Sequence, residues 1–207
     1  MALHNYDELN DLHLDVLREI GNIGSGNAAT SLSDMLAHPV YITVPTVQIL
    51  DYSQVVDDLG GPETMIVGLL LSLSGDVSGM MMFLLHQGFA HMTLNALIGE
   101  DIQSFAEIDE MGYSAIKEVS NIMAASFVNA ISQMTGLMIN ISTPDMTIDM
   151  LGAIMSVPAI HYANISDKII FIRDEFGNDT QRAPGHILMI PDVASLEKIL
   201  TNLGIEI

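Results

Sequence analysis

The 207-residue chain carries one polar pattern twice, and the second copy begins 99 positions after the first. Glu19 recurs as Glu118, Asn22 as Asn121, and Pro45 as Pro144. The position four residues before each Glu holds Asp15 in the first copy and Ser114 in the second. A pattern that returns with its distant proline in register indicates an internal duplication. We therefore predict a single domain over residues 1–207, with one repeat at about 7–99 and another at about 104–207.

The composition is that of a folded protein with a strongly acidic surface. Hydrophobic residues make up 49% of the chain and no low-complexity tract interrupts it, which argues against disorder. The formal net charge is -20, with only six Lys and Arg residues. Binding to nucleic acid or to an anionic membrane needs basic groups, so we expect neither as a partner. The absence of cysteine excludes disulfides, zinc–thiolate sites and thiol nucleophiles.

Neither a secretion signal nor a membrane-spanning helix is evident in the sequence. The first eight residues lack the basic region and the apolar core of a signal peptide. The most hydrophobic stretch, residues 65–85, is interrupted at 74–79 by Ser, Gly and Asp residues, which favours a hairpin. We expect a cytoplasmic protein, and because the pattern is already duplicated within one chain, a monomer suffices.

The first half predicts a long helix followed by strands. Apolar residues recur at threes and fours from about residue 7 to 36, the spacing of an amphipathic helix. Gly21, Gly24 and Gly26 lie inside it, and each costs about 1 kcal/mol relative to alanine, so we expect a packing reason for them. The segments that follow are a strand at 40–50 passing through Pro45, an acidic loop or short helix at 51–64, a hairpin of 65–73 with 79–85, and a helix at 87–98.

The second half predicts a similar series. A helix at about 104–135 ends at Gly136, a plausible C-cap. The segments that follow are a strand at 137–143, a short helix from Pro144 to about 155, a hairpin of 159–163 with 168–174, a polar loop at 175–185, a strand at 186–190, and a helix to about 203 that begins at Asp192.

Both halves therefore read as helix, strand, hairpin and helix, and the second adds a strand before its last helix. This order predicts an α+β fold. We expect a pseudo-two-fold duplicated repeat whose strands form one continuous antiparallel sheet, with the two long helices covering one face.

The repeated polar residues form a row on each long helix, because residues three and four apart share a helix face. The rows are Asp15, Glu19 and Asn22 in the first copy and Ser114, Glu118 and Asn121 in the second. We expect both to face solvent or a partner. Glu pairs with a cation, and the Asn amide orients a water without taking its proton, as a water-positioning Gln does in phosphoryl transfer. No Ser–His pair accompanies them, which gives a covalent mechanism little support.

Two other possible sites are disfavoured. The glycines at 21–26 lack the preceding strand and the lysine of a phosphate-binding loop. The seven histidines are scattered, and no pair has ligand spacing with a carboxylate. We therefore expect this chain to bind no metal and no cofactor of its own.

The pattern Asp/Ser-x3-Glu-x2-Asn-x22-Pro resembles that of the CheC/CheX/FliY phosphatase family of bacterial chemotaxis, and the resemblance covers essentially the whole chain. Two intact copies, together with Gly-Asn-Ile-Gly-Ser-Gly-Asn-Ala at 21–28, resemble CheC in particular. The resemblance implies dephosphorylation of phospho-CheY, the response regulator that sets flagellar rotation. The Mg2+ ion of that reaction belongs to CheY.

The resemblance also implies roles for the repeated residues. Glu19 and Glu118 pair with the active-site lysine of CheY. Asn22 and Asn121 orient water for in-line attack on the aspartyl phosphate. Asp15 and Ser114 assist at the rim, and Pro45 and Pro144 shape the adjoining strand or loop. Because the second copy has Met-Ala-Ala at 123–125, we expect two sites of one chemistry and unequal strength.

A second partner implied by the resemblance is the receptor deamidase CheD. The helix expected after Pro144 offers Asp149, Met150 and Leu151 as a docking surface. Two alternatives to a phosphatase stay open. One is an adaptor that binds phospho-CheY and CheD with little turnover, and the other is a structural α+β dimerisation module.

Overall fold

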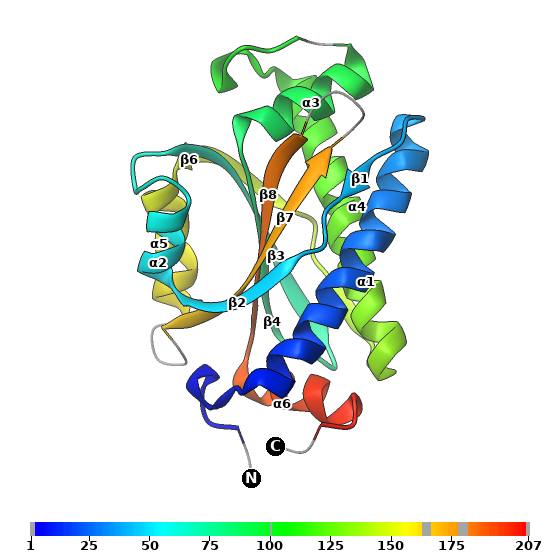
Figure 1. Ribbon diagram of the computed structural model, residues 1–207. Coiled ribbons are helices and arrows are strands. Elements are labelled where there is room, and N and C mark those ends of the chain that lie inside the picture. Colours follow the sequence, from blue (N-terminus) through cyan, green and yellow to red (C-terminus); the bar gives the residue numbers. More distant parts are fainter. Residues whose placement is uncertain (1–2, 100, 163–166, 178–181, 206–207) are drawn as a thin grey trace.

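The structure is a computed structural model that describes residues 3–99, 101–162, 167–177 and 182–205 (Figure 1). Both repeats contain the same order of elements. Those of the first are α1 (Asp11–Leu36), β1 (Tyr41–Ile42), β2 (Thr46–Asp51), α2 (Tyr52–Asp58), β3 (Met65–Gly75), β4 (Gly79–Leu85) and α3 (Gln87–Ile98). Those of the second are α4 (Glu110–Thr135), β5 (Ile139–Ile141), β6 (Asp145–Met150), α5 (Leu151–His161), β7 (Lys168–Gly177), β8 (Arg182–Pro191) and α6 (Val193–Asn202). A 3-10 turn precedes each long helix, at Tyr6–Glu8 and Phe105–Glu107.

The strands of the two repeats are interleaved in one antiparallel sheet. The pairing order is β1-β7-β8-β4-β3-β5, with β2 also paired to β7 and β6 to β3. The opening strands of each repeat therefore pair with the other repeat, and β4 of the first lies beside β8 of the second. Neither half could complete this sheet alone, so the predicted continuous antiparallel sheet is confirmed.

The helices are placed on the sheet according to their apolar faces. The long helices α1 and α4 lie side by side and run in opposite directions on one face of the curled sheet, as predicted (Figure 1). The short helices α2 and α5 lie on the other face, so helices cover both faces of the sheet and not one as predicted (Figure 1). Two buried apolar clusters result, one on each face of the sheet. The centre of the sheet is therefore covered by apolar side chains on both faces, and β4 is buried along most of its length.

Several segments of the first repeat match the prediction closely. The 65–85 stretch forms the β3–β4 hairpin, and α3 spans the expected residues. The predicted strand at 40–50 is divided into β1 and β2, with Pro45 in the gap between them. This division follows from the missing amide proton of proline, which cannot join a ladder of hydrogen bonds.

The second repeat contains the errors of prediction. Residues 145–150, predicted as helix, form the strand β6, and residues 159–161, predicted as strand, belong to α5. The buried residues of α5 recur at a helical spacing, which the presence of Pro158 within the helix obscured. They are Leu151, Ile154, Met155 and Pro158.

The final hairpin also differs from the prediction. Residues 168–174 pair in β7 with β8 rather than with 159–163, and β7 and β8 extend through most of the predicted polar loop. The residues that join the two predicted strands of this hairpin, 164–167, lie largely outside the described residues. Because β7 and β8 match β3 and β4, the idea of an extra strand in the second half is wrong.

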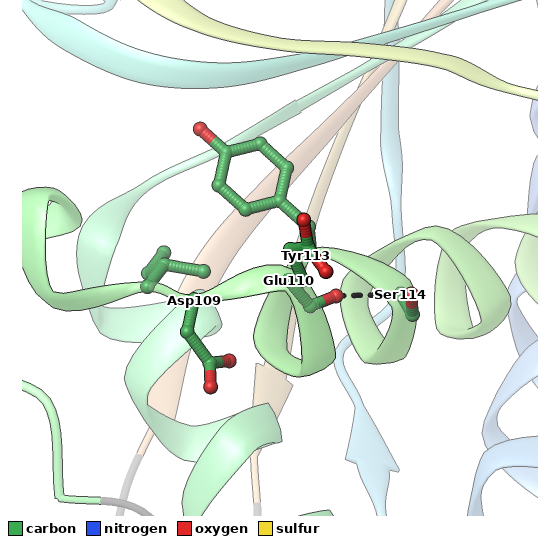
Figure 2. Close-up of a pocket in the computed structure, with 5 residues that line it drawn as sticks. Asp109, Glu110, Tyr113 and Ser114 are labelled. Carbon is green, nitrogen blue, oxygen red and sulfur yellow. Dashed lines mark hydrogen bonds between the residues drawn. The ribbon is translucent and has the colours of Figure 1, made fainter.

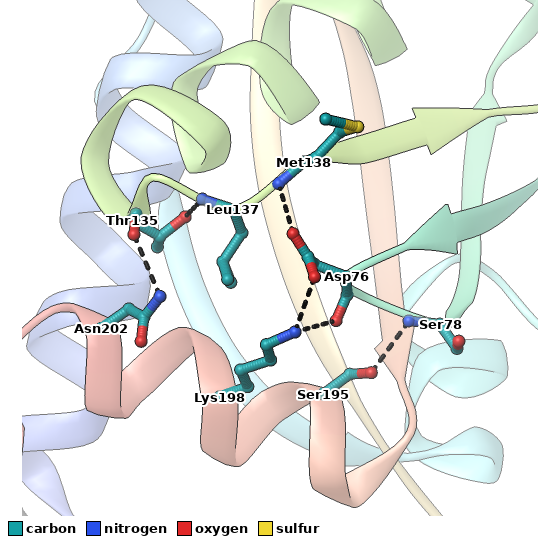
Figure 3. A network of polar contacts seen from close by, with 8 residues as sticks. All are labelled: Asp76, Ser78, Thr135, Leu137, Met138, Ser195, Lys198 and Asn202. Atoms are coloured by element: carbon teal, nitrogen blue, oxygen red, sulfur yellow. Dashed lines mark hydrogen bonds and ion pairs between the residues drawn. The ribbon is translucent and has the colours of Figure 1, made fainter.

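A group of polar contacts joins the β3–β4 turn of the first repeat to the second repeat (Figure 3). The Asp76 carboxylate accepts hydrogen bonds from the Met138 amide and from Lys198 Nζ, each at 2.9 Å. These two contacts lower the pKa of Asp76. Next to them, the Ser78 amide donates to Ser195 Oγ at 2.8 Å, which fixes the start of α6. Within the described part of the chain, no helix is both long enough and apolar enough to span a membrane.

Candidate functional site: two exposed Glu–Asn rows

The first polar row lies near the beginning of α1, which is capped by Asn10. The Asn10 side chain accepts hydrogen bonds from the amides of Leu12 and His13, so the helix begins at a defined residue. From there the helix buries Leu17 and Ile20 against the sheet and leaves Glu19 and Asn22 exposed. Two side chains with complementary hydrogen-bonding chemistry are therefore presented to solvent one turn apart.

The second row lies at the equivalent place on α4. Asp109 caps this helix through the amide of Gly112. Ser114 and Glu118 are exposed, and Asn121 is half-buried. Because α1 and α4 run in opposite directions (Figure 1), the two rows lie toward opposite ends of the helix pair. Each row therefore offers a separate approach for a partner.

Each proline is buried, and the chain before it makes the same contacts in both repeats. Thr43 donates its amide to the Glu175 carbonyl at 3.2 Å and accepts the Glu175 amide through Oγ1 at 3.3 Å. Ser142 makes the same two contacts with Ser72, both at 3.0 Å. Near each proline, a side-chain hydroxyl oxygen thus accepts the amide of the neighbouring strand, where the regular backbone pairing of the sheet is interrupted. The sequence interpretation had missed these two hydroxyl residues, although they lie 99 positions apart.

The surfaces next to the two rows differ. Beside Asn22 is a hollow of about 110 Å3, lined by Asn22, Ser25, Gly26, Ala29, Ile42, Thr43 and Val44. Around Ser114 is a wide, open depression whose lining includes Asp109, Glu110 and Tyr113 (Figure 2). Figure 2 shows the Tyr113 ring pointing away from Ser114, whose hydroxyl donates to the Glu110 carbonyl at 3.0 Å. The second site therefore has a more acidic entrance with an aromatic ring.

The rim residues also differ in their contacts. Asp15 forms an ion pair with Arg18 on the next turn of α1. Ser114 carries no charge and is bonded to its own helix, so it does not pair with Lys117 in this way. Arg18 thus neutralises the charge of Asp15, and Glu19 is the exposed carboxylate one turn from Asn22.

The residues expected to dock a second partner are not on one helix. Asp149 and Met150 end the strand β6, and Met150 pairs with Met65 of β3. Both methionines are about half exposed, at 49% and 48%. Leu151, in contrast, is fully buried at the start of α5, so this residue contributes to the core and is not available to a partner.

Among the described residues, no group of three or more His, Asp or Glu side chains could hold a metal ion. The two rows themselves offer carboxylate and amide groups on the surface of a helix. Such groups insert into a partner's site more readily than they enclose a small molecule.

Comparison with known proteins agrees with the duplicated architecture. A model of the CheC-like family matches residues 12–49 and again residues 111–148. The chain is 30% identical over 204 residues to the CheY-P phosphatase CheC of Bacillus subtilis, covering 96% of this chain and 97% of that protein. It is also 30% identical over 139 residues to the flagellar motor switch phosphatase FliY of the same organism, covering 67% of this chain and 36% of that protein.

A solved structure shows the same fold. The crystal structure of FliY from Thermotoga maritima superposes with a TM-score of 0.77 and 23% identity, covering 95% of this chain and 98% of that chain. At that identity the likeness concerns the fold alone. The sequence relationship with CheC, which spans nearly the full length of both proteins, is the stronger one. This chain belongs to the CheC-like family.

Proposed function

We propose that this chain hydrolyses the aspartyl phosphate of phospho-CheY at two sites, one at Glu19 and Asn22 and the other at Glu118 and Asn121. The observation that carries the proposal is the exposed Glu–Asn row, present twice in a chain related along its whole length to a CheY-P phosphatase. Each row lies on a long helix packed on the sheet, and helical geometry fixes the spacing of two side chains that are one turn apart.

The chemistry follows from the two functional groups. The Glu carboxylate pairs with an active-site lysine of the partner and sets the register of docking. One turn later the Asn carbonyl accepts a hydrogen bond from a water, and its amide donates to a phosphoryl oxygen or to that water. The water oxygen then attacks phosphorus as the bond from phosphorus to the aspartyl oxygen breaks.

The proton of the water goes to the phosphate, because a carboxamide is too weak a base to accept it. The products are inorganic phosphate and the free aspartate of the partner. The Mg2+ ion remains with CheY throughout, and this chain contributes positioning. Because the proposed substrate is a chemotaxis response regulator, the proposal also implies a cytoplasmic location.

The test is the decay of phosphorylated CheY with four forms of this protein. These are the wild type, Glu19→Ala/Asn22→Ala, Glu118→Ala/Asn121→Ala, and the combination of all four changes. We expect each double variant to retain the activity of its remaining site and the quadruple variant to lose the acceleration. A quadruple variant as active as the wild type would overturn the proposal. Since all four residues are at least partly exposed, these changes leave the core intact.

The same assay separates the two alternative functions. An adaptor would bind phospho-CheY with no faster phosphate release in the wild type. A structural module would neither bind phospho-CheY nor respond to charge reversal at Glu19 and Glu118, and it would dimerise. Size-exclusion chromatography with light scattering measures that last property directly.

We propose further that CheD docks on the surface formed by Asp149, Met150 and the exposed side of α5. Met65 and Met150 are paired at the sheet edge, and Val157 and Ile160 on α5 are 47% and 77% exposed. Calorimetric titration of CheD into Ile160→Glu should show weakened binding. Met138→Glu is a matched control, since Met138 is 70% exposed and lies just before β5, where its backbone bonds to Asp76 in the β3–β4 turn. Equal affinity for both variants would exclude this surface.

A further inference from the structure

A buried hydrogen bond underlies the first site and has no counterpart in the second. Ser25 lies on α1 three residues after Asn22, and its hydroxyl donates to Asp174 Oδ2 of β7 at 2.6 Å. Both residues are 1% exposed. Ser25 also lines the hollow beside Asn22. The contact therefore ties the turn of α1 that carries Asn22 to the strand beneath it.

The equivalent residues of the second repeat are apolar. Ala124 lies 99 positions after Ser25. Thr46 pairs with Arg173 in the first site, and Asp145, its equivalent, pairs with Leu70 in the second. The next residue of each strand is Asp174 in β7 and Leu71 in β3. A polar pair in one repeat thus replaces an apolar pair in the other, at matched positions.

The position of Asp174 also coincides with the interruption at Pro45. Ile42 pairs with Phe176 and Thr46 with Arg173, so the segment 43–45 lies opposite Asp174 and Glu175. That segment contributes Thr43 and Val44 to the hollow beside Asn22. Asp174 therefore lies where α1, β7 and the proline segment meet.

We propose that Asp174 is a positioning residue of the first site, which acts through Ser25 to seat the Asn22 turn of α1 against the proline segment. This inference rests on the proposed function and adds a determinant that the second site lacks. It gives the first site alone a dependence on a buried carboxyl group. Asp174 acts through Ser25 and touches no substrate.

Among the described residues, only the hydrogen bond from Ser25 compensates a charge on Asp174. Ser25 faces it from α1, uncharged Thr43 and Val44 lie on the proline segment, and Gly185 pairs with it from β8. Its neighbours on β7, Arg173 and Glu175, are exposed, and alternate side chains of a strand point to opposite faces.

One carboxyl oxygen, Oδ1, is buried with no hydrogen-bond partner. Burial raises the pKa of Asp174 to about 7, and the bond from Ser25 opposes that rise. Ionisation leaves a buried, half-satisfied carboxylate, which is costly. Because the cost of burying the charge exceeds the gain from the Ser25 bond, the packing of the Asn22 turn of α1 on β7 is most stable when Asp174 is protonated. This packing is weakened when Asp174 ionises.

The test uses two proteins that each keep one site: Glu118→Ala/Asn121→Ala for the first and Glu19→Ala/Asn22→Ala for the second. The ratio of their kcat/KM values on phospho-CheY is measured between pH 6 and 8.5, and the pH response of CheY cancels in the ratio. We expect the first-site activity to fall about tenfold relative to the second between pH 6.5 and 8, as a single ionisation does. Asp174→Asn in the first-site protein should keep the hydrogen bond and abolish this fall.

A ratio that stays flat with pH, or one that Asp174→Asn leaves unchanged, would overturn the inference. The double change Ser25→Ala/Asp174→Leu, which installs the residues of the second repeat, should also give a pH-independent first site. Circular dichroism of these variants, and the activity of the same substitutions made in the second-site protein, report whether the fold is retained.

A second readout does not depend on phosphatase activity. The side-chain amide resonances of Asn22 in wild-type protein should titrate with a midpoint near 7, and those of Asn121 should not. The Asn22 titration should vanish in Asp174→Asn. If no variant accelerates CheY dephosphorylation, the proposed function fails while this titration still decides the role of Asp174.

Discussion

The ring of Phe127 on α4 lies directly over Gly24 on α1, where a Cβ atom would come within 2.6 Å of ring atom Cδ1. Phe127 is fully buried, so its ring has little room to move aside. Gly24 is therefore what lets the two long helices approach, and their approach sets the relation between the two polar rows.

Gly24→Ala should lower stability, because the new methyl group overlaps an aromatic ring that is packed on all sides. Overpacking of this kind costs about 1–3 kcal/mol, less the gain of about 1 kcal/mol from a better helix former. Thermal unfolding measures the change. Gly26→Ala is the matched control, since nothing lies within 4 Å of its added Cβ, and it should raise stability by up to about 1 kcal/mol. Equal shifts in both variants would contradict this account.

Gly21→Ser should be tolerated although Gly21 lies between Glu19 and Asn22. Its added Cβ would meet only ordinary contacts, the nearest being Val47 Cγ2 at 3.4 Å. The equivalent residue of α4, Ser120, is fully buried and donates its hydroxyl to the Ile116 carbonyl at 2.8 Å. We expect a change in unfolding free energy within about 0.5 kcal/mol and unchanged first-site activity. A loss of more than about 2 kcal/mol in chemical denaturation would show that the two repeats pack differently here.

Asn22→Asp should inactivate the first site while preserving its shape. The change removes the amide donor and places a negative charge beside a phosphoryl group, so that both docking and water orientation suffer. We expect a loss of about 100-fold in kcat/KM at that site, measured with the second site silenced by Glu118→Ala/Asn121→Ala. Asn22→Ala, with no added charge, should lose less affinity for phospho-CheY. If Asn22→Asp is as active as the parent, the amide has no role in orienting water.

Asp174→Asn should change how stability depends on pH. The folded pKa of Asp174, about 7, lies above its ordinary value of 3.8, so the folded protein binds the proton more tightly. The contribution of Asp174 to stability is complete below pH 4, declines between pH 4 and 7, and is lost above 7. The asparagine variant should gain on the order of 4 kcal/mol relative to wild type over that window. Urea titrations at pH 5 and pH 8 should show about 3 kcal/mol of this change, and a difference that stays constant between the two pH values would contradict it.

His186→Gln should give the opposite slope. His186 is buried and stacks on Phe171, and burial lowers its pKa from 6.5 to about 3. The folded protein resists its protonation, so its contribution to stability is present above pH 6.5 and is lost as the pH falls toward 3. The variant should thus lose less stability than wild type between pH 6.5 and 4, by an amount on the order of 3 kcal/mol. Identical acid unfolding curves for the two proteins would contradict the burial argument.

The parts of the fold that local pattern could predict are those whose partners are close in sequence. The spacing of apolar residues identified α1 and α4, and the Gly-containing turn at 74–79 identified the β3–β4 hairpin. The alternation of polar and apolar residues in β6 was also visible, as was its 99-residue correspondence to β2. The prediction of a helix from Pro144 to about 155 used neither signal.

For the candidate site, too, local pattern predicts the residues that are close in sequence and misses those that are distant. Local helical spacing already placed Glu19 beside Asn22 and Glu118 beside Asn121 on shared faces. It gave no indication of Ser25 and Asp174, which lie 149 positions apart. It also wrongly placed Leu151 on an exposed surface, because the buried side of α5 depends on which face of the sheet the helix covers.

The sequence by itself determined that the chain is a duplication with two Glu–Asn rows on long helices, because periodicity and repeats are properties of the chain order. Only the tertiary structure decided that the repeats exchange their opening strands, and that one row rests on a buried carboxyl group while the other rests on leucine and alanine. Pairings between distant segments depend on how whole layers pack, and no local spacing encodes them. For that reason the two sites share one pattern and differ in the chemistry beneath it.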